Sequence, residues 1–328
     1  MHIAIAKETA EFEKRVALTP DLVKRLCDGG HTITVEKGAG VEAGFLDDSY
    51  KVSGAAIAKN FAEAVSEAQI VLKVGPISEK QIESLQKNSV LIGMQKVFEN
   101  QSLFKKVNKS KVTAFALEFV PRTTRAQSMD VLSSQSNLAG YRAVIEGSYE
   151  FDRALPLMMT AAGTVTAARV LVMGAGVAGL QAIATARRLG AIVSAFDVRA
   201  AAKEQVESLG ATFVEVDYQE SGDGSGGYAK EMSEGYKQAQ AAKLLEVLKT
   251  QDIVITTALI PGKTAPVLLT ADMVDQMKVG SVIVDLAIEA GGNCALSKPG
   301  ITVTKNGVKI VAHPNMPSRI AYNASQLY

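Results

Sequence analysis

The sequence has few of the residues that hold metals or form cross-links. Its two cysteines, Cys27 and Cys294, are far apart and form no Cys-x-x-Cys pair. Its three histidines, His2, His31 and His313, lack the local spacing of a metal site. We therefore expect reduced thiols and no bound metal.

Two other features are missing. With 35 basic and 34 acidic residues the formal net charge is +1, so the charge balance favours neither nucleic acid nor an anionic membrane surface as a partner. No apolar run approaches the roughly 18 to 20 residues of a membrane-spanning helix, and the sequence starts with a strand-like HIAIA without a signal peptide. These absences predict a soluble, cytoplasmic protein.

The most informative pattern lies in segment 169–199, RVLVMGAGVAGLQAIATARRLGAIVSAFDVR. An apolar, strand-like run over 169–173 precedes Gly174, Gly176 and Gly179, which have the G-x-G-x-x-G spacing, and a helical pattern follows as far as Gly190. The first glycine permits a tight turn, the second lets a pyrophosphate approach the backbone, and the third lets the helix pack on the strand. This segment therefore predicts a dinucleotide site.

An acidic residue ends the next predicted strand. Asp197 stands 197 − 174 = 23 positions after Gly174, close to the spacing of about 20 for a carboxylate that binds the ribose 2′-hydroxyl. A carboxylate there would repel a 2′-phosphate, so we expect NAD rather than NADP, although Arg199 leaves some room for the second. The alternative is that the glycines serve only to pack a helix against a sheet.

The chain alternates strand-like and helical segments on both sides of the glycine pattern. Strands are expected over 3–6, 32–36, 70–74, 90–94 and 113–117, and then over 192–196, 212–216, 253–257, 282–286 and 308–312. This alternation predicts an α/β fold with two Rossmann-like, doubly wound parallel-sheet domains, a cleft between them and a long helix from Val131 joining them. We expect the first domain over 1–133 plus 313–328 and the nucleotide-binding domain over 134–312, with a hairpin over 157–168.

Two loops carry further hypotheses. The segment 221–227, SGDGSGG, is either a disordered surface loop or a mobile lid over the cofactor, with Tyr228 behind it. The segment TTALIPGKTAP, from Thr256, follows a strand whose C-terminal end should face the nucleotide crevice. A simple strand-ending turn is the competing interpretation of this second loop.

Several segments together resemble one family over essentially the whole chain. RAQSMDVLSSQSNLAGYRAV, MGAGVAGLQAIATARRLGA, GGYAKEM, TTALIPGKTAP and GSVIVDLAIEAGGNC are similar to the NAD(H)-binding domain of proton-translocating NAD(P) transhydrogenase. The opening KETAEFEKRVALTP also resembles alanine dehydrogenase, which shares the fold.

The transhydrogenase resemblance implies which residues bind the nucleotide. Arg122, Gln127, Asp130 and Ser133 match the polar loop around the nicotinamide, and we assign them the catalytic, positioning role; Asp130 capping the long helix, with Arg122 paired to it, is the alternative. The resemblance and the glycine pattern together imply these cofactor contacts: Arg122, Thr123, Thr124, Gln127, Asp130, Ser133, Gly174, Ala175, Gly176, Val177, Gly179, Asp197, Val198, Arg199, Gly227, Tyr228, Gln240 and Leu259.

The resemblance also implies an activity that depends on partners. The family transfers a hydride directly from NADH to NADP+, with Re/Si specificity, and couples the transfer to proton translocation. The NADP(H) would lie on a partner domain, a separate membrane domain would carry the protons, and family members continue beyond Tyr328. We expect a homodimer that is active only with these domains and lies peripherally on the cytoplasmic face of the inner membrane.

Two other functions remain as alternatives. An amino acid (alanine) dehydrogenase must move protons, and its family has a histidine after the fourth strand of the first domain, where this sequence has Gln95 and Lys96. Glu289 replaces that family's aspartate, whereas Arg15 and Lys73 match both families. A non-catalytic NAD-sensing module would not need the polar RAQSMD segment around the nicotinamide.

The choice of nucleotide tests the assignment of Asp197. We expect NADH to bind at least about 10-fold more tightly than NADPH, because the carboxylate accepts the 2′-hydroxyl and repels a 2′-phosphate. Asp197→Ala should remove most of that preference in calorimetric titrations. Equal affinities in the wild type, or an unchanged preference in the variant, would show that Asp197 does not bind the ribose.

Overall fold

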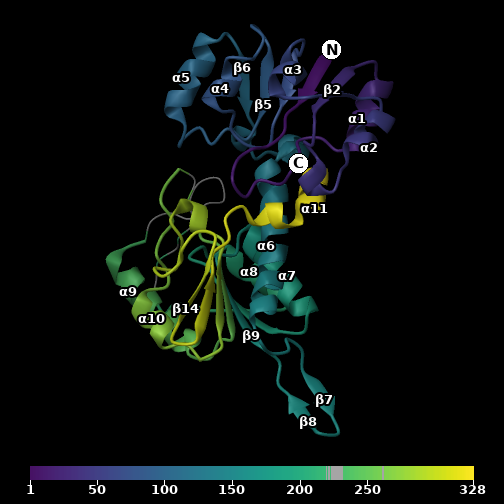
Figure 1. Ribbon diagram of the computed structural model, residues 1–328. Helices are drawn as coiled ribbons and strands as arrows, with labels where there is room; N and C mark the ends of the chain where they lie inside the picture. Colours follow the sequence, from purple (N-terminus) through teal and green to yellow (C-terminus); the bar gives the residue numbers. More distant parts are fainter. Residues whose placement is uncertain (219, 221, 223–231, 261) are drawn as a thin grey trace. The chain divides into compact units, whose positions relative to one another are not determined.

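The computed structural model describes residues 1–218, 220, 222, 232–260 and 262–328. The chain divides into two compact units. Unit 1 contains Met1–Gln135 and Pro317–Tyr328, and unit 2 contains Ser136–Met316. Figure 1 follows the chain through both, with the last residues, in yellow, returning to unit 1.

Unit 1 is built on a six-stranded sheet of order β3-β2-β1-β4-β5-β6 in which neighbouring strands pair in parallel. The chain crosses the sheet centre between β1 and β4, so loops at the carboxyl ends of these two strands diverge. The strands are β1 (His2–Ile5), β2 (Thr32–Glu36), β3 (Ala56–Ala58), β4 (Ile70–Leu72), β5 (Val90–Gly93) and β6 (Thr113–Ala116).

Helices cover both faces of this sheet because its strand residues are buried on both sides. One apolar cluster joins Ala4, Val71 and Leu91 to α3 (Phe61–Val65), α4 (Glu79–Ile82) and α5 (Gln101–Lys109). The other cluster joins Ile3, Ile5 and Ile33 to α1 (Pro20–Asp28), α2 (Asp47–Val52) and α11 (Ala321–Gln326). Short 3-10 turns are η1 (Val41–Ala43), η2 (Leu117–Phe119), η3 (Thr124–Met129) and η6 (Met316–Ile320).

Unit 2 contains a seven-stranded sheet of order β11-β10-β9-β12-β13-β15-β14. The strand pairs are parallel apart from β14 with β15 at one edge. The strands are β9 (Arg169–Met173), β10 (Ile192–Phe196), β11 (Thr212–Phe213), β12 (Ile253–Thr256), β13 (Val282–Asp285), β14 (Thr302–Lys305) and β15 (Val308–Val311).

Alternate residues of the central strands pack against different helix layers. Val170 and Val172 join the cluster that contains residues of α6 (Val131–Glu150), α7 (Val177–Arg188) and α8 (Ala202–Ser208). Leu171 and Met173 join the cluster that contains residues of α9 (Glu234–Leu248) and α10 (Ala271–Asp275). With both faces covered in this way, the carboxyl edge of the sheet, where β9 leads into α7, is the place at which such folds bind ligands.

The hairpin formed by β7 (Met158–Thr160) and β8 (Gly163–Val165) pairs with neither large sheet. In Figure 1 it projects away from the seven-stranded sheet of unit 2. All six of its strand residues are exposed, including Met159 at 79%. An isolated two-stranded hairpin gains little stability by itself, so this segment is held at its base rather than by its own strands.

The predicted α/β fold is confirmed, and most predicted strands differ from the observed ones by one or two residues. The strand predicted over 212–216 ends at Phe213, and the short β3 and the antiparallel β14 were not predicted. We also expected the Thr19 side chain to cap α1; Thr19 occupies the capping position, but its side chain makes no cap hydrogen bond. In the described segments of the chain, no helix combines the length and apolar character needed to span a bilayer.

Helix α6 approaches α7 very closely within unit 2. A Cβ on Gly140 would lie 2.0 Å from the carbonyl oxygen of Ala178, so only glycine permits this contact. At Gly147 on the same helix a Cβ would meet side-chain methyl groups at 3.2 and 3.3 Å, which can shift. The backbone contact at Gly140 therefore sets how closely these two helices pack.

Substitution of the two glycines separates backbone conflict from helix propensity. We expect Gly140→Ala to lower the free energy of unfolding by about 2 kcal/mol or more, since a backbone must move. Gly147→Ala should change it by less than about 1 kcal/mol, because the gain in helix propensity offsets mild crowding. Denaturant titration measures both, and equal effects would show that the Gly140 contact does not constrain the fold.

Candidate nucleotide-binding site

The turn between β9 and α7 depends on two of its glycines. Gly174 has φ of 103°, and a Cβ there would lie 2.5 Å from Thr257 Oγ1. A Cβ on Gly179 would lie 1.8 Å from the carbonyl oxygen of Gly174. The first glycine thus permits the turn, and the third lets the helix start directly against it, as the sequence predicted.

The middle glycine lies in open space. Gly176 occupies the N-terminal capping position of α7, and a Cβ there would have no described atom within 4 Å. The first amides of a helix have no partner within the helix and carry a partial positive charge. The turn therefore offers room and N–H donors to an anion such as a pyrophosphate, which fits the expected dinucleotide.

Asp197 holds this turn from the end of β10. Its Oδ2 accepts from the Ala175 backbone N–H at 2.7 Å, and its Oδ1 accepts from the Arg199 backbone N–H at 2.9 Å. The Arg199 side chain adds hydrogen bonds from Nε to Oδ1 at 2.9 Å and from Nη2 to Oδ2 at 2.7 Å. Burial, with the charges of Asp197 and Glu220, raises the pKa of the nearby Tyr236 hydroxyl.

A second set of hydrogen bonds holds the turn from the end of β12. Thr257 Oγ1 donates to the carbonyl oxygen of Gly174 at 2.9 Å. The next residue, Ala258, is bound by Asn293, whose Oδ1 accepts from its N–H and whose Nδ2 donates to its carbonyl oxygen, both at 2.9 Å. Asn293 Nδ2 also donates to the Pro266 carbonyl oxygen at 2.8 Å, so one buried side chain orders the segment 258–266.

Asn293 is itself positioned by Asp285, which is fully buried at the end of β13. The Asp285 carboxylate accepts from the backbone N–H groups of Ala287, Asn293 and Cys294 and from two hydroxyls, Thr256 Oγ1 at 3.0 Å and Ser297 Oγ at 2.6 Å. Burial, together with the Asp285 charge, raises the pKa of the Cys294 thiol.

Sequence analysis did not identify Asp285 or Asn293 as part of the site. Both lie in the segment GSVIVDLAIEAGGNC, but their partners are mainly backbone atoms, which no spacing pattern in the sequence reveals. The one usable signal was an acidic residue at the end of a continuous apolar strand, VIVD. A buried carboxylate there needs several donors, and the following loop provides them.

The polar segment expected around a nicotinamide lies in unit 1. Arg122, Thr123, Thr124 and Gln127 are exposed there. Asp130 Oδ1 accepts from the Ser133 N–H at 3.0 Å and Oδ2 accepts from Ser133 Oγ at 2.6 Å, which is the capping geometry of the alternative interpretation.

The Asp130 carboxyl titrates below its ordinary range. Partial burial acts to raise its pKa, but the Ser133 hydrogen bonds and the charge of Arg122 outweigh burial and lower it. Asp130 is therefore firmly ionised at neutral pH, and it starts α6 directly after the segment that carries Gln127.

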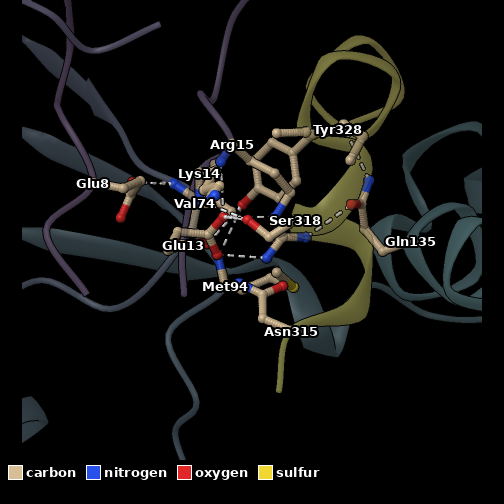
Figure 2. Close-up of polar contacts among 12 residues, drawn as sticks. Glu8, Glu13, Lys14, Arg15, Val74, Met94, Gln135, Asn315, Ser318 and Tyr328 are labelled. Atoms are coloured by element: carbon tan, nitrogen blue, oxygen red, sulfur yellow. Dashed lines mark hydrogen bonds and ion pairs between the residues drawn. The ribbon is translucent and has the colours of Figure 1, made fainter. Parts of the chain in front are cut away.

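Unit 1 also contains a buried polar cluster at the carboxyl edge of its sheet (Figure 2). Lys73 Nζ lies 3.0 Å from Glu8 Oε2, with both side chains almost fully buried, and Arg15 Nη2 lies 2.6 Å from Glu13 Oε2. Arg15 Nη1 also donates to Gln135 Oε1 at 2.8 Å. Burial raises the pKa of the Glu8 carboxyl, while Lys73 and the Val74 N–H oppose that rise.

The side chain of Gln95 lies fully buried near this cluster. A Cβ on the adjacent Gly93 would lie 3.4 Å from Gln95 Nε2 and 2.3 Å from the Lys73 carbonyl oxygen. Among the described residues, neither Nε2 nor Oε1 of Gln95 has a hydrogen-bond partner. Tyr328 closes the same edge, because its hydroxyl accepts from the Met94 N–H and donates to the carbonyl oxygens of Lys73 and Val74, each at 3.1 Å.

The other predicted contacts are distributed over unit 2. Val177 is the first residue of α7 and is 38% exposed, Val198 accepts at its carbonyl oxygen from the Gly222 N–H, and Leu259 is 48% exposed. Gln240 lies on α9 and is partly buried. Gly227 and Tyr228, with most of the segment 221–227 expected to be a lid or a disordered loop, lie outside the described residues.

Fold and site together define a Rossmann-type α/β protein with a dinucleotide-binding turn. Two family models match the chain: "Alanine dehydrogenase/PNT, N-terminal domain" over residues 4–139 and "Alanine dehydrogenase/PNT, C-terminal domain" over residues 143–328. The protein belongs to the alanine dehydrogenase/PNT family.

Its relatives include members of both branches. The first of the two chains of the NAD(P) transhydrogenase alpha subunit of Rhodospirillum rubrum is 56% identical over 335 residues, which cover 100% of this chain and 87% of the relative. The crystal structure of transhydrogenase from Sinorhizobium meliloti is 48% identical with a TM-score of 0.90, covering 100% of this chain and 91% of that one. Alanine dehydrogenase of Halomonas elongata is 31% identical, covering 99% of this chain and 84% of that protein.

The lowered pKa of Asp130 gives a pH-dependent contribution to stability. Because the carboxyl has a lower pKa folded than unfolded, its contribution is complete above the ordinary pKa of about 3.9 and is lost as the pH falls through the lower folded value. Asp130→Asn, which retains a capping side chain without the charge, should be about 0.3 to 1 kcal/mol less stable at pH 7. Denaturant titrations from pH 7 to pH 3 should show the difference shrinking; a constant difference would contradict this account.

Proposed function

We propose that this chain is the NAD(H)-binding component of a proton-translocating transhydrogenase. It binds NADH in unit 2 and presents it for direct hydride transfer to NADP+ on a partner domain. Sequence identity of 56% to the transhydrogenase subunit over the whole chain carries this proposal. The open turn at Gly176 and the carboxylate at the end of β10 support it chemically.

Transhydrogenation fits the groups available in the chain. A hydride passes from the C4 of one nicotinamide to the C4 of the other, so no protein acid or base is required. The two rings must approach to about 3 to 3.5 Å in a site that excludes water, which makes positioning the main contribution of the protein. We assign this role to the exposed segment that carries Arg122 and Gln127, with Asp130 and Ser133 holding its end.

The polar cluster of unit 1 argues against alanine oxidation. Both cations that would hold an amino acid carboxylate are paired within the chain, Arg15 with Glu13 and Lys73 with Glu8. Gln95 stands where a dehydrogenase would need an imidazole, and an amide does not exchange protons near neutral pH. A relative at 31% identity shows that the fold supports alanine oxidation elsewhere in the family, so these side chains decide the question.

Partners complete the proposed activity. A separate domain holds NADP(H), and a membrane domain couples the transfer to proton translocation, which places this chain peripherally on the cytoplasmic face of the inner membrane. The exposed hairpin β7–β8 supports a homodimer, since Met158, Met159 and Val165 are apolar and between 42% and 79% exposed. Such a projecting apolar segment is typical of an interaction site.

The role of Gln127 is tested by separating binding from transfer. We expect Gln127→Asn to leave NADH affinity within a few-fold of the wild type, because the amide positions the ring rather than holding the nucleotide. It should slow single-turnover transfer to NADP+ on the partner domain by at least about 10-fold, since the shorter side chain no longer reaches its contact. Stopped-flow spectroscopy with saturating NADH measures the rate.

Ser128→Ala, an exposed neighbour in the same 3-10 turn, is the matched control and should transfer at the wild-type rate. An unchanged rate in Gln127→Asn would remove Gln127 from the mechanism. Rapid alanine-dependent reduction of NAD+ by the wild-type chain without a partner would overturn the transhydrogenase proposal and leave the dehydrogenase alternative.

A further inference from the structure

The carboxylate of Asp197 has no remaining acceptor capacity. An ionised carboxylate has about four lone-pair sites, two on each oxygen. Oδ1 accepts from the backbone N–H and from Nε of Arg199, and Oδ2 accepts from the Ala175 N–H and from Nη2 of Arg199. Side-chain exposure is 7% for Asp197 and 19% for Arg199, so another donor has little access.

A ribose hydroxyl can therefore reach Asp197 only by replacing one of these donors. Two of the four are backbone N–H groups: Ala175 lies in the turn that Gly174 and Gly179 constrain, and the Arg199 backbone follows directly from β10. The other two belong to the guanidinium, which is carried on rotatable bonds. The guanidinium is thus the group that can leave without changing the fold.

The chemistry of the replacement is matched. The guanidinium presents two N–H donors side by side to the two carboxylate oxygens, and the 2′- and 3′-hydroxyls of a ribose present two O–H donors in a similar arrangement. We propose that Arg199 occupies the position of the adenosine ribose on Asp197 and that NADH binds by displacing its guanidinium. This inference rests on the proposed binding of NADH in unit 2.

Displacement makes Arg199 a determinant of both affinity and specificity. Breaking a partly buried ion pair opposes NADH binding, so the wild-type affinity is lower than an unpaired carboxylate would give. The released guanidinium carries its charge close to the ribose, where it attracts a 2′-phosphate and reduces the repulsion by Asp197. Arg199 therefore weakens NADH binding and, at the same time, weakens the rejection of NADPH.

Calorimetric titration of Arg199→Leu with three nucleotides tests the proposal. NADH should bind about 3- to 10-fold more tightly than to the wild type, and NADPH about 3- to 10-fold more weakly. The analogue of NADH with a 2′-deoxyadenosine should change by no more than about 2-fold, because it lacks the hydroxyl that competes with the guanidinium. Arg188→Leu, which removes an exposed charge at the end of α7, should leave the NADPH-to-NADH affinity ratio unchanged.

Arg199→Gln serves if Arg199→Leu does not fold, since it keeps one N–H donor and should shift all three affinities in the same directions by smaller factors. Weaker or unchanged NADH binding in a folded variant would overturn the proposal, as would equal tightening of NADH and the deoxy analogue. Asp197→Ala in the same series separates the two claims. If it weakens NADH binding while Arg199→Leu fails to strengthen it, only the displacement is wrong; if it has no effect, Asp197 does not bind the ribose.

Discussion

The close contact between Gly179 and the carbonyl oxygen of Gly174 determines the geometry of the nucleotide site. With no Cβ at either position, α7 starts directly at the end of β9, and its first amides face the carboxyl edge of the sheet. Hydrogen bonds then hold the turn from both neighbouring strands, through Asp197 after β10 and Thr257 after β12. A binding site for an anion is therefore already ordered before the anion arrives, which limits the entropy lost on binding.

The two units share an architecture but use the same edge of the sheet differently. In unit 2 the edge presents open backbone amides at Gly176. In unit 1 it holds the buried pairs of Glu8 with Lys73 and Glu13 with Arg15, and Tyr328 closes it by bonding to the ends of β4 and β5. Buried pairs that satisfy one another contribute little net stability but keep charged side chains away from other roles. The difference explains why a repeated fold can have one nucleotide site.

Sequence analysis predicted the fold well because its signals are local. β2, β9 and β10 were predicted to the residue, since each is an apolar run bounded by turn residues, and the glycine spacing located the start of α7. The hydrogen-bonded group around Asp285 and Asn293 could not be predicted, because the side chains there bind backbone atoms of segments up to 35 residues away. The pairing of Arg199 with Asp197 escaped prediction for a different reason: the sequence places both residues at the site but not which donors fill the carboxylate.

The central claim is that NADH binds at the β9–α7 turn of unit 2. Amide hydrogen exchange, followed by mass spectrometry with and without saturating NADH, tests it most directly. The account predicts slower exchange in segments 174–180, 197–199 and 257–260, where the turn and the two supporting strands end, and little change around Glu8, Lys73 and Gln95. Protection confined to the unit 1 cluster, with none at the turn, would contradict it.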